Sequence, residues 1–189
     1  MTNNDVTVAV VAPGSPEYNH VEALFRQSCQ MRIVNIDRIQ NKDLWMNYQI
    51  KKQAIDTKNG TKTNEKQLFH GTDSSTIKTV NQNGFNRSYA GKNAACYGNG
   101  TYFAVDSSYS AHDQYSRPDA NGLKYMYLAR VLTGEFCAGQ QGMRAPPPKN
   151  PANNTDLYDS VTDNLAKPTM FVIFHDIQVY PEYLISFRK

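Results

Sequence analysis

The chain has 189 residues, which is enough for one domain with a sizeable hydrophobic core. The composition is that of a globular protein, with 40% hydrophobic and 20% charged residues, and 20 Lys and Arg against 17 Asp and Glu leave a net charge of only +3. A charge this small does not demand a nucleic-acid partner. No apolar run approaches the roughly 20 residues of a membrane span, and the first residues lack the basic segment and cleavage site of a signal peptide. We therefore expect an intracellular protein of the nucleus or the cytoplasm, with no membrane partner.

The three cysteines, Cys29, Cys96 and Cys137, are widely spaced, odd in number and without a C-x-x-C pair. This pattern indicates neither a disulfide framework nor a zinc site, so we expect a reducing compartment and no metal. A strand-like segment begins almost at the first residue. We expect residues 1–189 to form a single domain that belongs to a longer protein.

Two strands and two helices are predicted in the first third of the chain. Residues 6–12 and 31–40 alternate as strands do. The first helix begins after Ser15, which is followed by a proline, and the second begins after Asn41 and ends at Gly60. We expect the tryptophan of the second helix to anchor it in the core, and five of its residues fall on one face: Leu44, Trp45, Tyr48, Lys52 and Ile55.

The rest of the chain consists of short β-branched and aromatic runs separated by Gly, Asn, Asp and Pro, which predicts strands of an antiparallel sheet system. These runs are 66–72, 100–105, 123–134, 157–164, 169–180 and 182–188. Helices are predicted at 73–84, capped by Asp73, and at 107–116, so the fold class is α+β. Residues 86–100 and 135–156 have no regular pattern. We expect both to wall a cleft, because long ordered loops in a compact domain are often functional.

A histidine followed by a glycine, His70-Gly71, ends the strand run LFHGT. An isolated pair of this kind is more often a histidine satisfied inside a sheet and followed by a turn. The functional interpretation is that Gly71 lets a flat ligand approach the backbone while His70 offers ring nitrogens to a hydroxyl. A second segment, YGNGTYFAV, adds two glycines before Tyr102 on a strand, and alone it is equally a bulged strand with a core tyrosine.

Together these segments resemble the catalytic domain of the poly(ADP-ribose) polymerase superfamily, and within it the macrodomain-containing mono-ADP-ribosyltransferases. The resemblance covers nearly the whole chain and is carried by FHGT, NGFNRSYAGKNA, YGNGTYFAV, YSRPDANG, VLTG, PPPKNP, TDLYDSVTDN and YPEYLISF. It implies a diphtheria-toxin-like fold, with split antiparallel β-sheets flanked by short helices, that binds NAD+ as a co-substrate in a cleft. It also implies transfer of ADP-ribose to proteins, inhibitors that mimic nicotinamide, a donor loop at 86–100 and an acceptor-side loop at 135–156.

The resemblance assigns roles to individual residues. It implies that His70, the first member of the family's His-Tyr-Glu signature, bonds the adenosine ribose, and that the backbone of Gly71 holds the nicotinamide carboxamide. It implies that Tyr102 lies under the nicotinamide ribose and ring, that Ser110 bonds the carboxamide, and that Tyr115 sandwiches the ring against Tyr102. The adenosine side is matched by Thr72, Gly84 and Arg87.

The third signature position departs from the polymerases. Counting back from Gln178 aligns Met170 with the family's glutamate. A methionine does not accept a hydrogen bond as a carboxylate does and does not polarise an incoming ribose, so we expect transfer of a single unit. Glu182 lies beyond the aligned strand, and we interpret it as a surface or structural carboxylate.

The remaining chemistry follows from charge. Breaking the bond to a cationic nicotinamide passes through an oxocarbenium-like transition state and needs no general acid. Without the glutamate, a nucleophile that is already ionised is favoured. We therefore expect Asp or Glu acceptors on proteins, including the chain's own.

Two alternatives stay open. One is a catalytically silent NAD+-binding or scaffolding module that lost its activity with the glutamate; an intact set of His70, Tyr102, Ser110 and Tyr115 argues against it. The other is ADP-ribosylation of RNA termini, which is weaker because the chain has no basic stripe interleaved with aromatic residues. DNA is not an expected partner, because only 68 residues precede FHGT and they read as part of the same domain.

Overall fold

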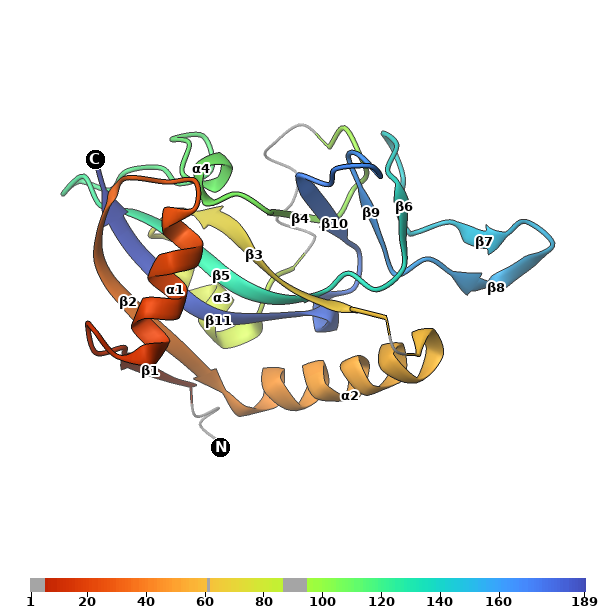
Figure 1. Cartoon of the computed structure of the whole chain (residues 1–189), viewed down its shortest axis with the longest axis horizontal. Coiled ribbons are helices and arrows are strands. Elements are labelled where there is room, and N and C mark those ends of the chain that lie inside the picture. The colour runs from red at the N-terminus through yellow and green to blue at the C-terminus, as the bar shows by residue number, and fades with distance from the viewer. Residues whose placement is uncertain (1–5, 61, 87–94) are drawn as a thin grey trace.

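A nine-stranded sheet dominates the computed structural model, which describes residues 6–60, 62–86 and 95–189 (Figure 1). In chain order the elements are β1 (Val6–Val10), α1 (Pro16–Arg26), β2 (Arg32–Asn41), α2 (Lys42–Asn59), β3 (Glu65–Thr72), α3 (Ile77–Asn83), β4 (Thr101–Ala104), α4 (Ser107–Ser110), β5 (Lys124–Leu132), β6 (Phe136–Ala138), β7 (Pro148–Asn150), β8 (Asn153–Leu157), β9 (Ser160–Thr162), β10 (Met170–Ile173), the 3-10 helix η2 (Asp176–Gln178) and β11 (Val179–Arg188). The predicted α+β class is confirmed.

Both predicted caps of the long helices are confirmed. The Ser15 hydroxyl accepts the Tyr18 N–H of α1 at 3.1 Å, and the Asn41 side chain accepts the Leu44 N–H of α2 at 3.1 Å. Each cap satisfies an amide that the helix itself leaves without a partner. The side chain of Asn41 also donates to two carbonyls at the end of α3, so this residue ties α2 to α3.

The strands lie in the order β1-β2-β11-β5-β3-β4-β10-β9-β6. Neighbouring strands of this sheet pair antiparallel, except for β6 with β9, which are parallel. β3 pairs with β5 along its whole length but meets β4 at the single pair Phe69–Ala104. The sheet is thus narrowly joined between β3 and β4, and the end of β3 that carries His70 lies just past that junction.

The sheet is buried on both faces, as the alternation along β5 demonstrates. Met126 and Leu128 pack with α1 through Val21 and Phe25, whereas Tyr127 packs into a second cluster, beside α3. The covering helices lie against opposite faces (Figure 1). Burial of both faces explains why the strand runs of this part of the chain are almost continuously apolar.

Several predicted segments were wrong, among them the strand expected at 169–180, which ends at Ile173 and is followed by the 3-10 helix η2. The helix expected at 107–116 ends at Ser110, and the helix expected at 73–84 begins at Ile77 because Asp73 instead accepts the Ser75 N–H in a preceding turn. The segment 135–156, expected to lack regular structure, contains β6, β7 and most of β8. The β7–β8 hairpin forms a separate two-stranded sheet that projects from the body of the molecule (Figure 1).

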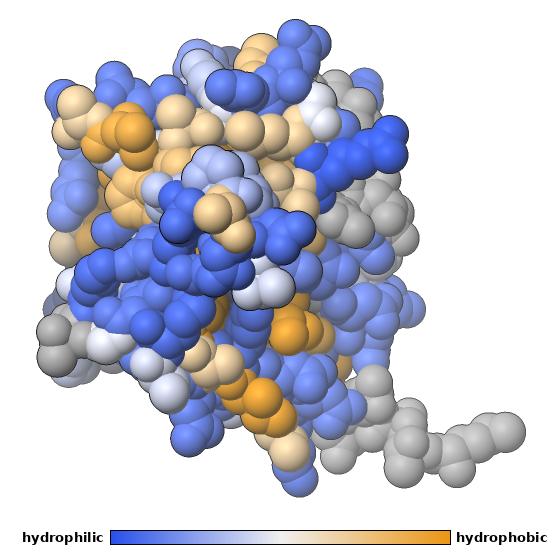
Figure 2. Space-filling model, turned by 90° about the vertical axis from the view of Figure 1, so that its right-hand side faces the viewer, coloured by the Kyte–Doolittle hydropathy of each residue, from blue (hydrophilic) through white to orange (hydrophobic). Residues whose placement is uncertain are grey.

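The hairpin is attached through charged side chains. Lys149 of β7 pairs with Glu135, which also pairs with Lys62, and Lys58 at the end of α2 reaches Asp159 at 2.5 Å. Seen from this end, the surface is largely hydrophilic, with smaller hydrophobic areas between the polar ones (Figure 2). Trp45, predicted to anchor α2 in the core, packs on Tyr48 and Tyr180 but keeps 37% of its surface exposed.

Within the described ranges, no helix is both long and apolar enough to cross a membrane. The cysteines are free thiols: Cys29 is buried, Cys137 half-buried and Cys96 exposed. No cluster of three or more metal-ligating side chains lies within the described residues.

Candidate active site

His70 is held by contacts that fix both its orientation and its tautomer. Its Nδ1 lies 2.7 Å from the carbonyl oxygen of Tyr102, and its ring meets the rings of Phe85 and Phe103 at centroid distances of 4.9 and 5.3 Å. A carbonyl only accepts, so Nδ1 carries the proton and donates it. Burial lowers the pKa of His70, although the bond to Tyr102 opposes this shift. The ring is therefore neutral near pH 7, and its Nε2 is a hydrogen-bond acceptor, as a ribose hydroxyl requires.

Gly71 is required by packing. A Cβ at this position would lie 2.5 Å from the Ser110 carbonyl oxygen, 2.8 Å from the Tyr115 Cβ and 2.9 Å from the Ser116 Oγ. The residues 110–116, which we call the strap, therefore press directly on the end of β3. Three of the four residues predicted to contact the nicotinamide, Gly71, Ser110 and Tyr115, are brought together in this way.

The strap is a hydrogen-bonded turn that follows α4. The N–H groups of Tyr115 and Ser116 both donate to the carbonyl of His112 at 2.9 Å. The fully buried Ser116 hydroxyl lies 2.8 Å from the Ser110 carbonyl and 2.6 Å from the Tyr125 carbonyl. These bonds hold Ser110, which is 3% exposed, against β3.

Tyr102 is half-buried on β4, paired with Val172 of β10. Its hydroxyl donates to the Gly98 carbonyl at 2.8 Å and accepts the Tyr97 N–H at 3.0 Å. The two glycines of YGNG serve close packing: a Cβ on Gly98 would lie 2.9 Å from the Phe174 ring, and one on Gly100 would lie 2.5 Å from the Ile173 carbonyl oxygen. The loop before β4 is thereby fixed against β10.

The partner of Tyr115 in this structure is Tyr109. The two rings stack at 5.0 Å and 25°, and their hydroxyls lie 2.8 Å apart. Burial and this hydrogen bond raise the pKa of Tyr109, with smaller contributions from Cys96 and Tyr102. The sandwich of a nicotinamide ring between Tyr115 and Tyr102 stays a prediction.

Met170, at the start of β10, pairs with Ala104, two residues along β4 from Tyr102. Because side chains alternate along a strand, Met170 and Tyr102 project from the same face of the sheet. Met170 is 9% exposed. Its N–H donates to Asp163 at 3.2 Å and its carbonyl accepts from the Thr162 hydroxyl at 2.8 Å, so its backbone is held from both sides.

The predicted adenosine-side residues divide into three cases. Thr72 is buried, and its hydroxyl bonds that of Thr76 just before α3. Gly84 ends α3 with φ +74° and donates to the Val80 carbonyl at 2.8 Å, a conformation that favours glycine. Arg87, like most of the predicted donor loop, lies outside the described residues.

Glu182 is a structural carboxylate. It is 9% exposed on β11 and lies 2.9 Å from Arg130, which also pairs with Glu65 at 3.3 Å. Burial raises the pKa of Glu182, while Arg130 opposes the shift. Glu65 begins β3, whereas His70 lies near the other end of the same strand, so this network is not part of the His70 site.

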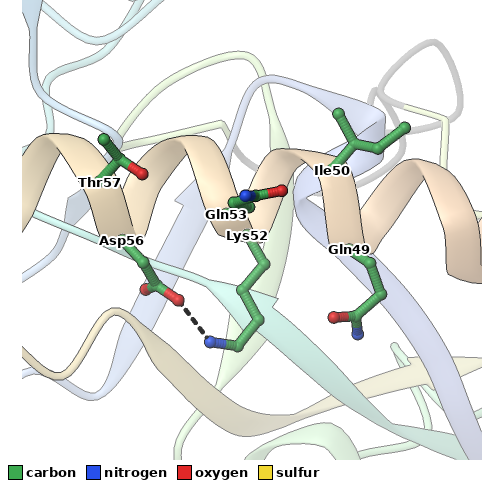
Figure 3. Close-up of a pocket in the computed structure, with 6 residues that line it drawn as sticks. All are labelled: Gln49, Ile50, Lys52, Gln53, Asp56 and Thr57. Carbon is green, nitrogen blue, oxygen red and sulfur yellow. Dashed lines mark hydrogen bonds and ion pairs between the residues drawn. The ribbon is translucent and has the colours of Figure 1, made fainter.

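A shallow depression on α2 is equally separate. It is lined by residues of this one helix, with Lys52 and Asp56 ion-paired at 2.6 Å across it (Figure 3). Gln49, Ile50, Gln53 and Thr57 complete the lining. It brings no further chemistry to the ends of β3 and β4.

Residues 15–189 match the model of a protein family described as the poly(ADP-ribose) polymerase catalytic domain. The chain belongs to this family. It is 58% identical, over its whole length, to human (Homo sapiens) protein mono-ADP-ribosyltransferase PARP14, of which it spans 10%. It is 40% identical to the mouse (Mus musculus) protein mono-ADP-ribosyltransferase PARP12 over 94% of this chain and 25% of that protein. It is 37% identical to mouse PARP11, also named a protein mono-ADP-ribosyltransferase, over 91% of this chain and 57% of that protein. The chain thus spans less than two thirds of the length of each of these relatives.

Three contributors to the site were missed from the sequence. Phe85 orients the His70 ring, Ser116 closes the strap, and Tyr109 stacks on Tyr115. No role was predicted for Tyr109 from the sequence. Its spacing of six residues from Tyr115 gives no helical signal, and only the turn after Ser110 brings the two rings together.

Proposed function

We propose that this domain transfers single ADP-ribose units from NAD+ to Asp or Glu side chains of proteins, including its own, and releases nicotinamide. The observation that carries the proposal is the convergence of His70, Gly71, Tyr102, Ser110 and Tyr115 on the ends of β3 and β4, with Met170 beside them. Membership of the family and the similarity to protein mono-ADP-ribosyltransferases support it.

Donor binding uses the groups just described. In the neutral His70 ring, Nε2 accepts a hydrogen bond from a hydroxyl of the adenosine ribose, since Nδ1 donates its proton to the Tyr102 carbonyl. The nicotinamide end lies between the Gly71 backbone and the strap, where aromatic rings and a buried serine provide stacking and polar contacts. NAD+ is the co-substrate, and the proposal requires no metal.

The reaction follows from the charge of the donor. The bond between the ribose C1′ and the nicotinamide nitrogen breaks, its electron pair leaves with nicotinamide, and an oxocarbenium-like centre develops at C1′. A carboxylate oxygen attacks this centre and forms an ester. The leaving group is neutral after departure, so no proton transfer is needed.

Met170 limits the product. Elongation needs a carboxylate that polarises a ribose hydroxyl of the unit already attached, and a thioether does not do this. An acceptor that is already ionised needs no such help. Single-unit transfer to carboxylates follows from both statements.

The test measures the products of the reaction and the chemical bond that joins ADP-ribose to the protein. The wild-type domain and His70→Ala are incubated with labelled NAD+, and nicotinamide release and labelled protein are measured before and after neutral hydroxylamine. Label that is lost with hydroxylamine and absent from His70→Ala supports the proposal. NAD+ binding without release points to a silent module, and label on an RNA 5′-phosphate but not on protein points to the RNA alternative; either result contradicts the proposal.

A further inference from the structure

Lys124 is a buried cation whose partners both belong to the strap. Its side chain is 1% exposed, and its ammonium donates to the Ala111 carbonyl and, at 2.6 Å, to an oxygen of Asp113. It also lies 5.7 Å from the centre of the Phe187 ring. A buried charge is costly unless it is paired, so these contacts are needed wherever Lys124 is kept.

The partners of Lys124 stand between the two predicted nicotinamide contacts of the strap. Ala111 and Asp113 lie after Ser110 and before Tyr115 in the chain. Tyr125, the next residue of β5, accepts from the Ser116 hydroxyl at 2.6 Å. Two consecutive residues at the start of β5 therefore hold the strap, one in its middle and one at its end.

The difference in exposure between Lys124 and Asp113 shows which of the two residues depends on their contact. Asp113 keeps 55% of its side chain exposed, and its other oxygen is 3.3 Å from the largely exposed Lys189. Asp113 therefore remains solvated without Lys124, whereas Lys124 has no access to water. The strap covers Lys124, and the hydrogen bonds of the Lys124 ammonium hold the strap against β5.

We propose that Lys124 is a positioning residue that sets the affinity of the site for the nicotinamide end of NAD+, by fixing the strap against Gly71. The proposal rests on the proposed function, because it takes Ser110 and Tyr115 as contacts of nicotinamide. Lys124 acts through the strap and does not itself touch the donor. Such contacts are made alike in the ground state and the transition state, so their loss raises KM and leaves kcat nearly unchanged.

The first variant is Lys124→Met. It removes the buried charge and keeps most of the volume, and the freed Asp113 is solvated, so folding stability should change little. The KM for NAD+ should rise about tenfold, because binding is sensitive to small displacements of the Ser110 and Tyr115 contacts. The dissociation constant of benzamide, a nicotinamide mimic that needs no turnover, should rise by the same factor. Lys124→Arg keeps the charge and should retain most of the affinity, and Lys51→Met, on α2, is the matched control.

The outcomes separate the two proposals. A folded Lys124→Met with the KM and benzamide affinity of the wild type, or with a loss confined to kcat, overturns the positioning role. If Lys124→Met does not fold, Asp113→Asn decides by the same readouts, because it changes a largely exposed side chain. A wild type that neither consumes NAD+ nor binds benzamide refutes the proposed function itself, and the role of Lys124 falls with it.

Discussion

Gly71→Ala should separate a packing requirement from general destabilisation. The new Cβ would lie 2.5 Å from the Ser110 carbonyl oxygen, and an ordinary contact begins at 3.4 Å, so the strap must move by about 0.9 Å. The oxygen belongs to the backbone and has no rotamer by which to avoid the methyl group. A displacement of about 1 Å near the reacting groups costs roughly a hundredfold in rate. We expect kcat/KM for NAD+ to fall by about that factor, and stability to fall by about 1–3 kcal/mol through overpacking.

The assay measures NAD+ turnover and urea unfolding on the same preparation. Gly60→Ala is the control: among the described residues, and apart from its chain neighbours, no atom lies within 4 Å of its added Cβ, but its φ of +70° strains any side chain. It should lose about 1 kcal/mol of stability without loss of turnover. A Gly71→Ala domain that keeps its kcat/KM within threefold of the wild type would refute the contact between the strap and β3.

Three further predictions concern charge and stability. His70 is a base whose folded-state pKa is lowered, so the unfolded chain takes up a proton first as the pH falls. The contribution of His70 to stability is therefore present above the unfolded pKa of about 6.5 and is lost as the pH falls below that value. NAD+ turnover should fall in the same direction, and His70→Gln should remove this pH dependence. Arg130→Met should lower the free energy of unfolding by about 2 kcal/mol, because it leaves Glu182 buried without its cation, whereas the turnover of the folded fraction should stay unchanged. Asp159→Ala should cost about 3 kcal/mol, because its carboxylate joins Lys58, Asn59 and the Glu135 N–H across three segments.

Each of these has a result that would contradict it. A pH profile of His70→Gln that matches the wild type would assign the titration to another group. A loss of turnover in folded Arg130→Met would place the Glu182 network in the reaction. An Asp159→Ala domain with wild-type unfolding in urea would mean that Lys58 and Asn59 find equivalent partners elsewhere.

Local signals in the sequence were sufficient for the helices that begin with strong caps. Ser15 and Asn41 each precede a periodic run, and both helices begin where these residues predict. The strands of the central sheet were found for a similar reason, since continuous apolar runs such as that of β5 mark burial on both faces.

The errors fall where tertiary contacts decide local structure. The segment after Ser110 has no glycine or proline before Pro118 that would end a helix, but the buried Lys124 and Ser116 hold it as a turn. β6 is a strand only because it lies beside β9, its parallel partner, from which it is separated by more than twenty residues. No window of the sequence around either segment contains that information.

The site also contains some residues that the sequence identified and others that only tertiary contacts reveal. His70, Gly71, Tyr102, Ser110 and Met170 were named from motif resemblance, and the described structure puts all five at the ends of β3, β4 and β10 or on the strap. The reason for Gly71 was only partly foreseen: it was expected to admit a ligand, and it also admits the strap. Lys124 carried no signal in the sequence, because a lysine at the start of a strand ordinarily lies in solvent.

The most direct test of the account is the intact mass of the domain after incubation with NAD+, with peptide mapping of each modified carboxylate. We predict that every modified residue in the wild type carries one ADP-ribose unit, that His70→Ala carries none, and that any further units appear only in Met170→Glu. Chains of two or more units on a single residue of the wild type would contradict the limit set by Met170, and an unchanged mass in the presence of measurable NAD+ binding would contradict the transferase activity.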